Sequence, residues 1–193
     1  PASSAAATRS ASPQAPPAPD YWPTAGWRVA LPAEQGLDAA RLSQMSDAIQ
    51  AQDLALHSLL VIRHGYIVSE TYFAPYRADT KHELYSCTKS FIATLVGIAI
   101  DQHAIADVTQ PVADLLPGRT FKNPSAEKAA MTLAHLLTMT TGLDWTEGDP
   151  AYRAMYMSRD WVSYVMDLPM RAQPGVEFNY CSGCSHILSA IVQ

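Results

Sequence analysis

The sequence predicts an α+β fold, in which an antiparallel sheet is flanked by helices and accompanied by a helical region. Two apolar runs separated by a short turn indicate a hairpin within residues 58–73. The rest of the chain, as far as Gln193, shows helical spacing and capping residues instead of further strands. Because two strands alone make a poor sheet, we expect the fold to be truncated before its C-terminal strands, which would lie beyond residue 193.

The composition fits one globular domain and argues against several classes of function. The chain has 193 residues, of which 48% are hydrophobic and 16% charged, and this is enough for a sizeable core. Its net charge of -5 argues against a nucleic-acid partner, because nucleic-acid binding needs a basic patch. No apolar run approaches the roughly 20 residues of a membrane span.

Residues 1–24 are predicted to be a disordered leader rich in Ala, Pro and Ser. Such a segment cannot bury enough apolar surface to offset the entropy lost on ordering. A leader of this kind often follows a removed export signal, so we expect a periplasmic or secreted protein, while a cytoplasmic location stays open. Residues 25–193 form the predicted folded domain, which we expect to be incomplete.

The elements of this domain follow one another in order. Asp38 is predicted to cap an amphipathic helix that runs to Gln50. The hairpin comes next, with its turn at His64-Gly65, where glycine tolerates a positive φ. The apolar residues 91–100 (FIATLVGIAI) then predict a helix that begins after Ser86.

Caps, turns and apolar stripes predict the later elements. They are a short helix from Thr109 to Pro117, a helix over 133–140 capped by Thr132 and stopped by Gly142, a helix over 161–168 capped by Asp160, an extended piece over 176–180 after the turn Pro174-Gly175, and a last helix over 186–192.

The strongest candidate for chemistry is Ser86-Cys87-Thr88-Lys89. If the following run is helical, Ser86 and Lys89 share one face of its first turn. A serine hydroxyl is a poor nucleophile and needs a base within hydrogen-bond reach. Lysine can be that base if burial or the helix dipole lowers its pKa, and the apolar helix is expected to bury Lys89 near its start. The backbone N–H of Ser86 could donate to an oxyanion.

The spacing alone is weak evidence, because Ser125-Ala126-Glu127-Lys128 repeats it. In that second copy we expect Ser125 to be a helix N-cap and Lys128 to be a solvated charge. An N-cap role is also the alternative for Ser86.

Tyr180 is the candidate for passing a proton to the leaving group, since it ends the extended piece and precedes Cys181 and Ser182. A neighbouring cation such as Lys89 would stabilise its phenolate. The alternative is an ordinary, half-buried strand aromatic.

The pair Cys181 and Cys184, in a chain with three cysteines, can indicate a redox pair or half of a zinc site. Zinc would also need Cys87 and His186 to converge on it, which the spacing does not support. We favour small, buried residues beside a turn. The six histidines are scattered along the chain and are expected to be surface or structural residues.

Three stretches occur in a fixed order: residues 85–91 (YSCTKSF), 135–145 (HLLTMTTGLDW) and 174–180 (PGVEFNY). Together they resemble the serine β-lactamase-related family, which includes class C β-lactamases, D-alanyl-D-alanine carboxypeptidases, esterases and 6-aminohexanoate-oligomer hydrolases. The resemblance covers roughly residues 25–193, and three ordered motifs are more specific than one.

This resemblance implies a β-lactamase/transpeptidase-like fold and a serine hydrolase. It implies Ser86 as the acylated nucleophile, Lys89 as its activating partner and Tyr180 as general base and acid. The substrate implied is a small-molecule ester or amide, cleaved through an acyl-enzyme. No metal or organic cofactor is implied.

The chain departs from the family pattern in two places. Tyr-x-Asn is replaced by Tyr180-Cys181-Ser182, so the substrate-binding position Ser182 offers a hydroxyl instead of an amide, which favours esterase or amide hydrolase over β-lactamase activity. The Lys/His-Thr/Ser-Gly element is missing, since residues 139–142 (MTTG) lack a basic residue. We therefore expect the chain to be inactive alone and to need a C-terminal complementing segment or chain. The alternative is a non-catalytic, penicillin-binding-like relative that binds cell-wall peptides or a partner.

Overall fold

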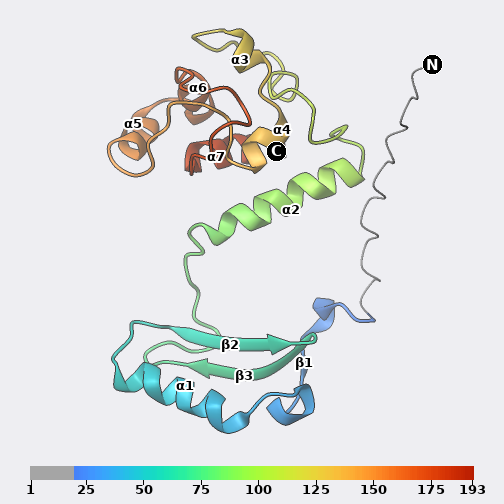
Figure 1. The fold of residues 1–193 in the computed structure, drawn as a ribbon, viewed down its shortest axis with the longest axis vertical. Coiled ribbons are helices and arrows are strands. Elements are labelled where there is room, and N and C mark those ends of the chain that lie inside the picture. The colour runs from blue at the N-terminus through green and yellow to red at the C-terminus, as the bar shows by residue number, and fades with distance from the viewer. Residues whose placement is uncertain (1–19) are drawn as a thin grey trace, which may run out of the picture. The chain divides into compact units, whose positions relative to one another are not determined.

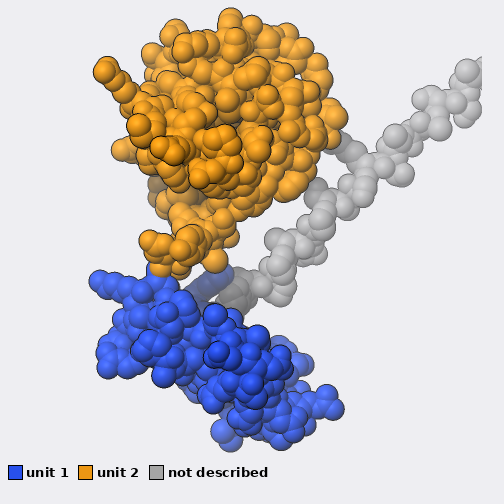
Figure 2. All heavy atoms as spheres, turned by 90° about the vertical axis from the view of Figure 1, so that its left-hand side faces the viewer, with its two compact units in different colours: residues 1–82 blue, residues 83–193 orange. Residues whose placement is uncertain are grey.

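The computed structural model describes residues 20–193 (Figure 1). The chain divides into two compact units, residues 1–82 and 83–193 (Figure 2). Residues 1–19, which make up most of the predicted leader, lie outside the described residues, while the last part of that segment includes the start of the 3-10 helix η1 (Pro23–Ala25).

The first unit is built on a three-stranded sheet with the order β1-β3-β2. β2 (Ser58–Arg63) and β3 (Tyr66–Tyr72) are antiparallel and are joined by His64-Gly65, whose φ values of 51° and 81° are both positive. The predicted hairpin is thereby confirmed. β1 (Arg28–Val29) pairs parallel with β3, and at two residues it is too short for a sequence pattern to indicate.

One helix lies along this sheet (Figure 1). α1 (Ala39–Ala51) follows the 3-10 helix η2 (Pro32–Gln35). The Asp38 carboxylate accepts from the backbone N–H groups of Ala40, at 2.8 Å, and Arg41, at 3.3 Å, which confirms the predicted cap.

The second unit is helical and contains the larger core. Its helices are α2 (Cys87–Asp101), α3 (Ala126–Ala129), α4 (Leu133–Leu137), α5 (Ala151–Met157), α6 (Trp161–Met166) and α7 (Ser182–Ile191). α7 packs against α2, α4 and α6 and buries Cys184, Ile187 and Leu188 on its inner face. No helix of residues 20–193 combines the length and hydropathy that crossing a bilayer requires.

Two helix predictions in this unit differ from the structure. The short helix from Thr109 to Pro117 is wrong: Pro111 forms an isolated bridge with Thr132, and the N–H of Val112 donates to Met131 O at 2.9 Å. Backbone groups that pair with a distant segment are not available for a helix. The helix predicted over 133–140 ends at Leu137, because Met139 adopts a φ of 56°.

The structure also differs from the prediction over residues 176–180 and at the start of α7. Residues 176–180 form no strand. α7 begins at Ser182, four residues before the predicted start at His186, because the Sγ of Cys181 accepts from the Cys184 N–H at 2.9 Å and caps the helix there. Asp160 does cap α6 as predicted, accepting from Ser163 N at 3.1 Å, although the helix ends at Met166.

The second Ser-x-x-Lys copy has a structural role. Ser125 is confirmed as an N-cap, since its Oγ accepts from Lys128 N at 3.1 Å. The prediction of a solvated Lys128 is wrong: the side chain is buried, and its Nζ donates to the carbonyls of Lys122, Met166 and Leu168 at 3.0, 2.7 and 2.8 Å. The loop after α6 covers this lysine, and a buried ammonium needs such acceptors.

A tight crossing near Gly142 holds the segment that leads to Tyr180. Gly142 has a φ of 76°, and a Cβ there would lie 2.2 Å from the carbonyl oxygen of Ala172. Its own carbonyl accepts from the N–H groups of Arg171, at 2.8 Å, and Ala172, at 3.3 Å. Further along, Gly175 N donates to Thr140 O at 2.8 Å. Residues 139–142 therefore anchor the chain that approaches the candidate site.

Replacing Gly142 with alanine is expected to destabilise the protein far more than the matched change Gly118→Ala. Both glycines have a φ near 77°, so both variants share a strain of about 1–2 kcal/mol. Only Gly142→Ala adds the clash with Ala172, which should cost about a further 1–3 kcal/mol. Urea unfolding of the two variants measures this difference, and equal losses would contradict the tight crossing.

Candidate active site

Ser86 lies at the N-cap of α2, and its hydroxyl is contacted by two of the predicted site residues, Lys89 and Tyr180. Lys89 Nζ donates to Ser86 Oγ at 3.1 Å, and the Tyr180 hydroxyl donates to the same oxygen at 2.7 Å. Ser86 Oγ accepts no backbone capping bond, in contrast to Ser125. Its side chain is exposed, so a substrate can reach it.

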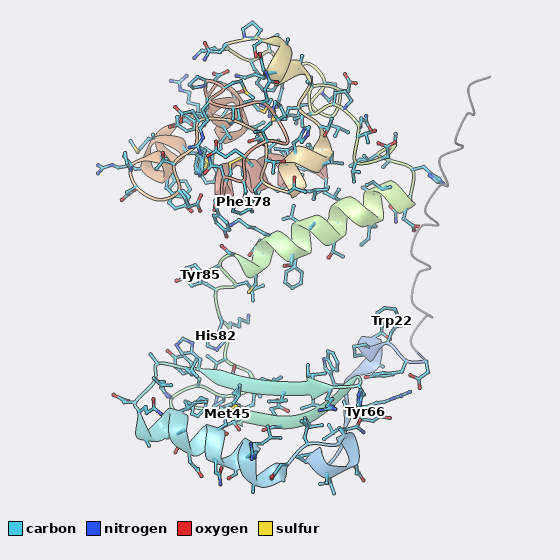
Figure 3. All side chains as sticks on the ribbon, viewed as in Figure 1. Trp22, Met45, Tyr66, His82, Tyr85 and Phe178 are labelled. Carbon is cyan, nitrogen blue, oxygen red and sulfur yellow. A yellow bond between two sulfur atoms is a disulfide. The ribbon has the colours of Figure 1, made fainter. Side chains whose placement is uncertain are left out.

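Two exposed aromatic residues stand next to these groups in the sequence. Tyr85 precedes Ser86 and is 80% exposed, and Phe178 precedes Tyr180 by two residues and is 66% exposed. Figure 3 shows both on the side of the second unit where α2 begins.

Lys89 makes three contacts with the other predicted residues. Besides Ser86, its Nζ donates to Ser182 Oγ at 3.0 Å and lies 4.9 Å from the centre of the Tyr180 ring. We expected α2 to bury this lysine, but Lys89 is only half-buried. α2 contacts α7, whereas Phe91, also on α2, is exposed.

Tyr180 has the electrostatics of a proton-transfer group. As a phenolate, Tyr180 can accept the hydroxyl proton of Ser86, and this hydrogen bond and the neighbouring Lys89 together lower the pKa of Tyr180. The preceding residue holds it in place: Asn179 N donates to Met139 O at 2.9 Å, and Asn179 Nδ2 donates to Trp145 O at 2.8 Å.

Ser182 stands at the start of α7, with its hydroxyl directed to a carboxylate that the sequence analysis missed. Ser182 Oγ donates to Glu147 Oε1 at 2.6 Å, and Ser182 N donates to Glu147 Oε2 at 3.0 Å. Trp145 Nε1 donates to Oε2 at 2.6 Å, and the Tyr152 hydroxyl donates to Oε1. Burial raises the pKa of Glu147, but these hydrogen bonds outweigh it and the pKa is lowered. No local spacing marks this glutamate.

Cys181 and Cys184 flank Ser182 and form a disulfide. Both residues are buried, as we favoured, but they are bonded to each other and lie at the start of a helix. Cys87 is a free, exposed thiol. Within residues 20–193, no three His, Cys, Asp or Glu side chains are grouped so that they could hold a metal ion.

Gly183 brings α7 into close contact with the rest of the core. A Cβ at this position would lie 2.7 Å from Val165 Cγ2 and 3.0 Å from Trp145 Cζ3. The first turn of α7 therefore packs directly against Trp145, which precedes Glu147 by two residues.

A cavity of about 210 Å³ opens beside Lys89 between α2 and α7. Its lining is rich in hydroxyl groups and consists of Tyr85, Thr88, Lys89, Ile92, Ser182, Ser185, His186 and Ser189. The arrangement thus offers a reachable serine hydroxyl, two groups that can handle its proton and adjoining space.

Comparisons with known proteins found a matching family and similar proteins. A family model described as Beta-lactamase matches residues 42–193. The chain is 28% identical over 172 residues to the 6-aminohexanoate-dimer hydrolase of Paenarthrobacter ureafaciens, which covers 80% of the chain and 41% of that protein.

Two solved structures share the fold. One is a Bacteroides dorei protein assigned as a beta-lactamase, with a TM-score of 0.62 and 19% identity, over 80% of this chain and 45% of that one. The other is EstCE1, a hydrolase with promiscuous acyltransferase activity, with a TM-score of 0.56 and 20% identity, over 79% of this chain and 47% of that one. The chain thus spans less than half the length of the relatives it matches.

Tyr180 is expected to ionise below the ordinary tyrosine pKa of 10.0, because Ser86 and Lys89 favour its phenolate. Ultraviolet titration of tyrosinate in the wild type and Tyr180→Phe measures this as a difference. In Lys89→Met the ionisation of Tyr180 should move to higher pH, since the stabilising charge is gone. Tyr85→Phe is the matched control and should remove a tyrosinate that forms above pH 10.0, because Glu83 raises the pKa of Tyr85. A Tyr180 titration unmoved by Lys89→Met would contradict the coupling.

Proposed function

The chain belongs to the beta-lactamase family, and from this premise we propose that it carries the nucleophile of a serine hydrolase that cleaves an ester or amide. The acyl group would be held on Ser86 as a covalent intermediate. Because the chain spans less than half the length of its relatives, the proposal concerns the full-length gene product or an assembly with a C-terminal segment or second chain.

The observation that carries the proposal is the convergence of Tyr180 and Lys89 on Ser86 Oγ, at 2.7 and 3.1 Å. In the acylation step, Tyr180 in its phenolate form would take the Ser86 proton while Oγ bonds to the substrate carbonyl carbon. The ammonium of Lys89 would stabilise the phenolate form of Tyr180. Tyr180 would then pass the proton to the leaving oxygen or nitrogen as its bond to the carbonyl carbon breaks. In deacylation, Tyr180 would take a proton from a water whose oxygen bonds to the acyl carbon, and would return it to Ser86 Oγ as the acyl–serine bond breaks.

The backbone N–H of Ser86 is a candidate oxyanion donor. It donates to no protein group in the part of the chain that the structure describes, so it is available to a substrate oxygen.

Ser182 supports simple esters or amides as substrates. In the family pattern an asparagine amide at this position would donate to a substrate carbonyl, whereas here the Ser182 hydroxyl donates to Glu147 and accepts from Lys89. The hydroxyl's single proton is therefore engaged within the protein. The names of two relatives, an aminohexanoate-dimer hydrolase and a hydrolase with acyltransferase activity, agree with this substrate class.

We also propose a periplasmic or extracellular location. The buried disulfide between Cys181 and Cys184 supports it, because disulfides persist mainly in oxidising compartments.

A fluorophosphonate probe is expected to add its mass to Ser86 in the full-length gene product. Ser86→Ala should abolish the labelling, because the nucleophile is gone. Ser125→Ala, which alters the other Ser-x-x-Lys copy, should leave it intact, since Ser125 only caps α3. Peptide mass spectrometry locates the adduct. Labelling that persists in Ser86→Ala would overturn the proposal, and binding of cell-wall peptides without labelling would favour the non-catalytic alternative.

Lys89→Ala and Tyr180→Phe are each expected to lower kcat for a nitrophenyl ester by about 10²–10⁴-fold. Tyr180→Phe removes the group that takes the Ser86 proton, and Lys89→Ala removes the charge that stabilises its phenolate. Lys122→Ala is the control: its side chain is 82% exposed and forms only a surface ion pair with Asp167. Steady-state kinetics on the full-length protein measure kcat for each variant. Lys89→Ala with the wild-type rate would rule out the assigned role.

A further inference from the structure

Glu147 collects four hydrogen bonds although it touches neither Ser86 nor Tyr180. The donors are the hydroxyl and backbone N–H of Ser182, the indole of Trp145 and the hydroxyl of Tyr152. The side chain is half-buried; it belongs to the loop between α4 and α5, and its hydrogen bonds reach the first turn of α7. A partly buried carboxylate with this many donors is held in one orientation.

The proton directions along this chain of groups are fixed by chemistry. The Lys89 ammonium can only donate, so Ser182 Oγ must accept from it at 3.0 Å. An ionised carboxylate can only accept, so the Ser182 hydroxyl proton must point to Glu147 at 2.6 Å. The carboxylate therefore turns a lone pair of Ser182 toward Lys89.

Resting on the proposed function, we propose that Glu147 is a positioning residue that acts through Ser182. By holding the Ser182 hydroxyl as an acceptor, it keeps Lys89 Nζ at the point where it reaches Ser86 Oγ, at 3.1 Å, and faces the Tyr180 ring. Its negative charge also lies one hydroxyl away from the ammonium, which favours the same placement.

The sharpest test is Glu147→Gln in the full-length gene product. Glutamine keeps the shape, but its NH₂ must face either the hydroxyls of Ser182 and Tyr152 or the N–H groups of Ser182 and Trp145. Toward the N–H groups the NH₂ sets donor against donor. Toward the hydroxyls it makes both of them accept, so the Ser182 proton no longer points to residue 147 and the lone pair that faces Lys89 is no longer fixed. We expect the rate of Ser86 acylation by a nitrophenyl ester, and kcat, to fall about 10–100-fold, because misplacing a catalytic group can cost about 10²-fold, while KM changes less than about threefold.

A double-mutant cycle with Ser182→Ala separates positioning from a general effect on folding. If Glu147 acts through Ser182, Glu147→Gln should cost less than about threefold once Ser182 is already alanine. Glu127→Gln is the matched control and should behave like the wild type, since that carboxylate contacts Gln173 at 3.3 Å and not the site. Should Glu147→Gln fail to fold, Glu147→Asp replaces it, because it keeps the charge but withdraws the carboxylate, and the same loss in kcat is expected.

The outcomes are distinct. Wild-type acylation rates in Glu147→Gln, or in Glu147→Asp where that variant is used, would overturn the inference and leave the proposed function standing. Equal losses with and without Ser182 would also overturn it, because Glu147 would then act by another route. A wild-type protein that never acylates Ser86 would instead refute the proposed function itself.

Discussion

The hydrogen bond from Lys89 to Ser182 joins the two helices on which the site depends. These residues are 93 positions apart in the sequence, yet their polar atoms lie 3.0 Å apart. Ser86 and Lys89 belong to the start of α2, and Tyr180 and Ser182 to the start of α7. Two positive helix ends therefore face a lysine. The accumulated positive charge favours anions at this point, which suits a phenolate, a developing oxyanion and the carboxylate of Glu147.

The position of the start of α7 is set by contacts of the chain that leads to it. Gly142 allows the chain to cross closely over Ala172, and Asn179 is bonded to Met139 and Trp145. These contacts tie the stretch before Tyr180 to the segment that carries Glu147. Because both belong to the second unit, the residues of the site share one core.

Sequence patterns predicted the residues that approach Ser86, because their spacing and order are local properties of three short stretches. Lys128 shows the limit of spacing: nothing near Ser125 indicates that the loop after α6, about 40 positions away, covers the lysine. Glu147 could not be predicted for the same reason, since its main partner, Ser182, is 35 positions away. The hairpin and the capped helices were predictable, because turn and cap residues act on their neighbours.

The close packing of α7 on Trp145 limits which substitutions can raise the thermal stability of the protein. A glycine inside a helix is ordinarily the first residue to replace, since alanine gains about 1 kcal/mol of helix propensity. At Gly183 the added methyl group would clash with Val165 and Trp145, so replacing this glycine with alanine would not stabilise the protein. The same missing methyl group lets the N-terminal end of α7 approach Trp145. Substitutions that raise the thermal stability should therefore be sought outside the first turn of α7.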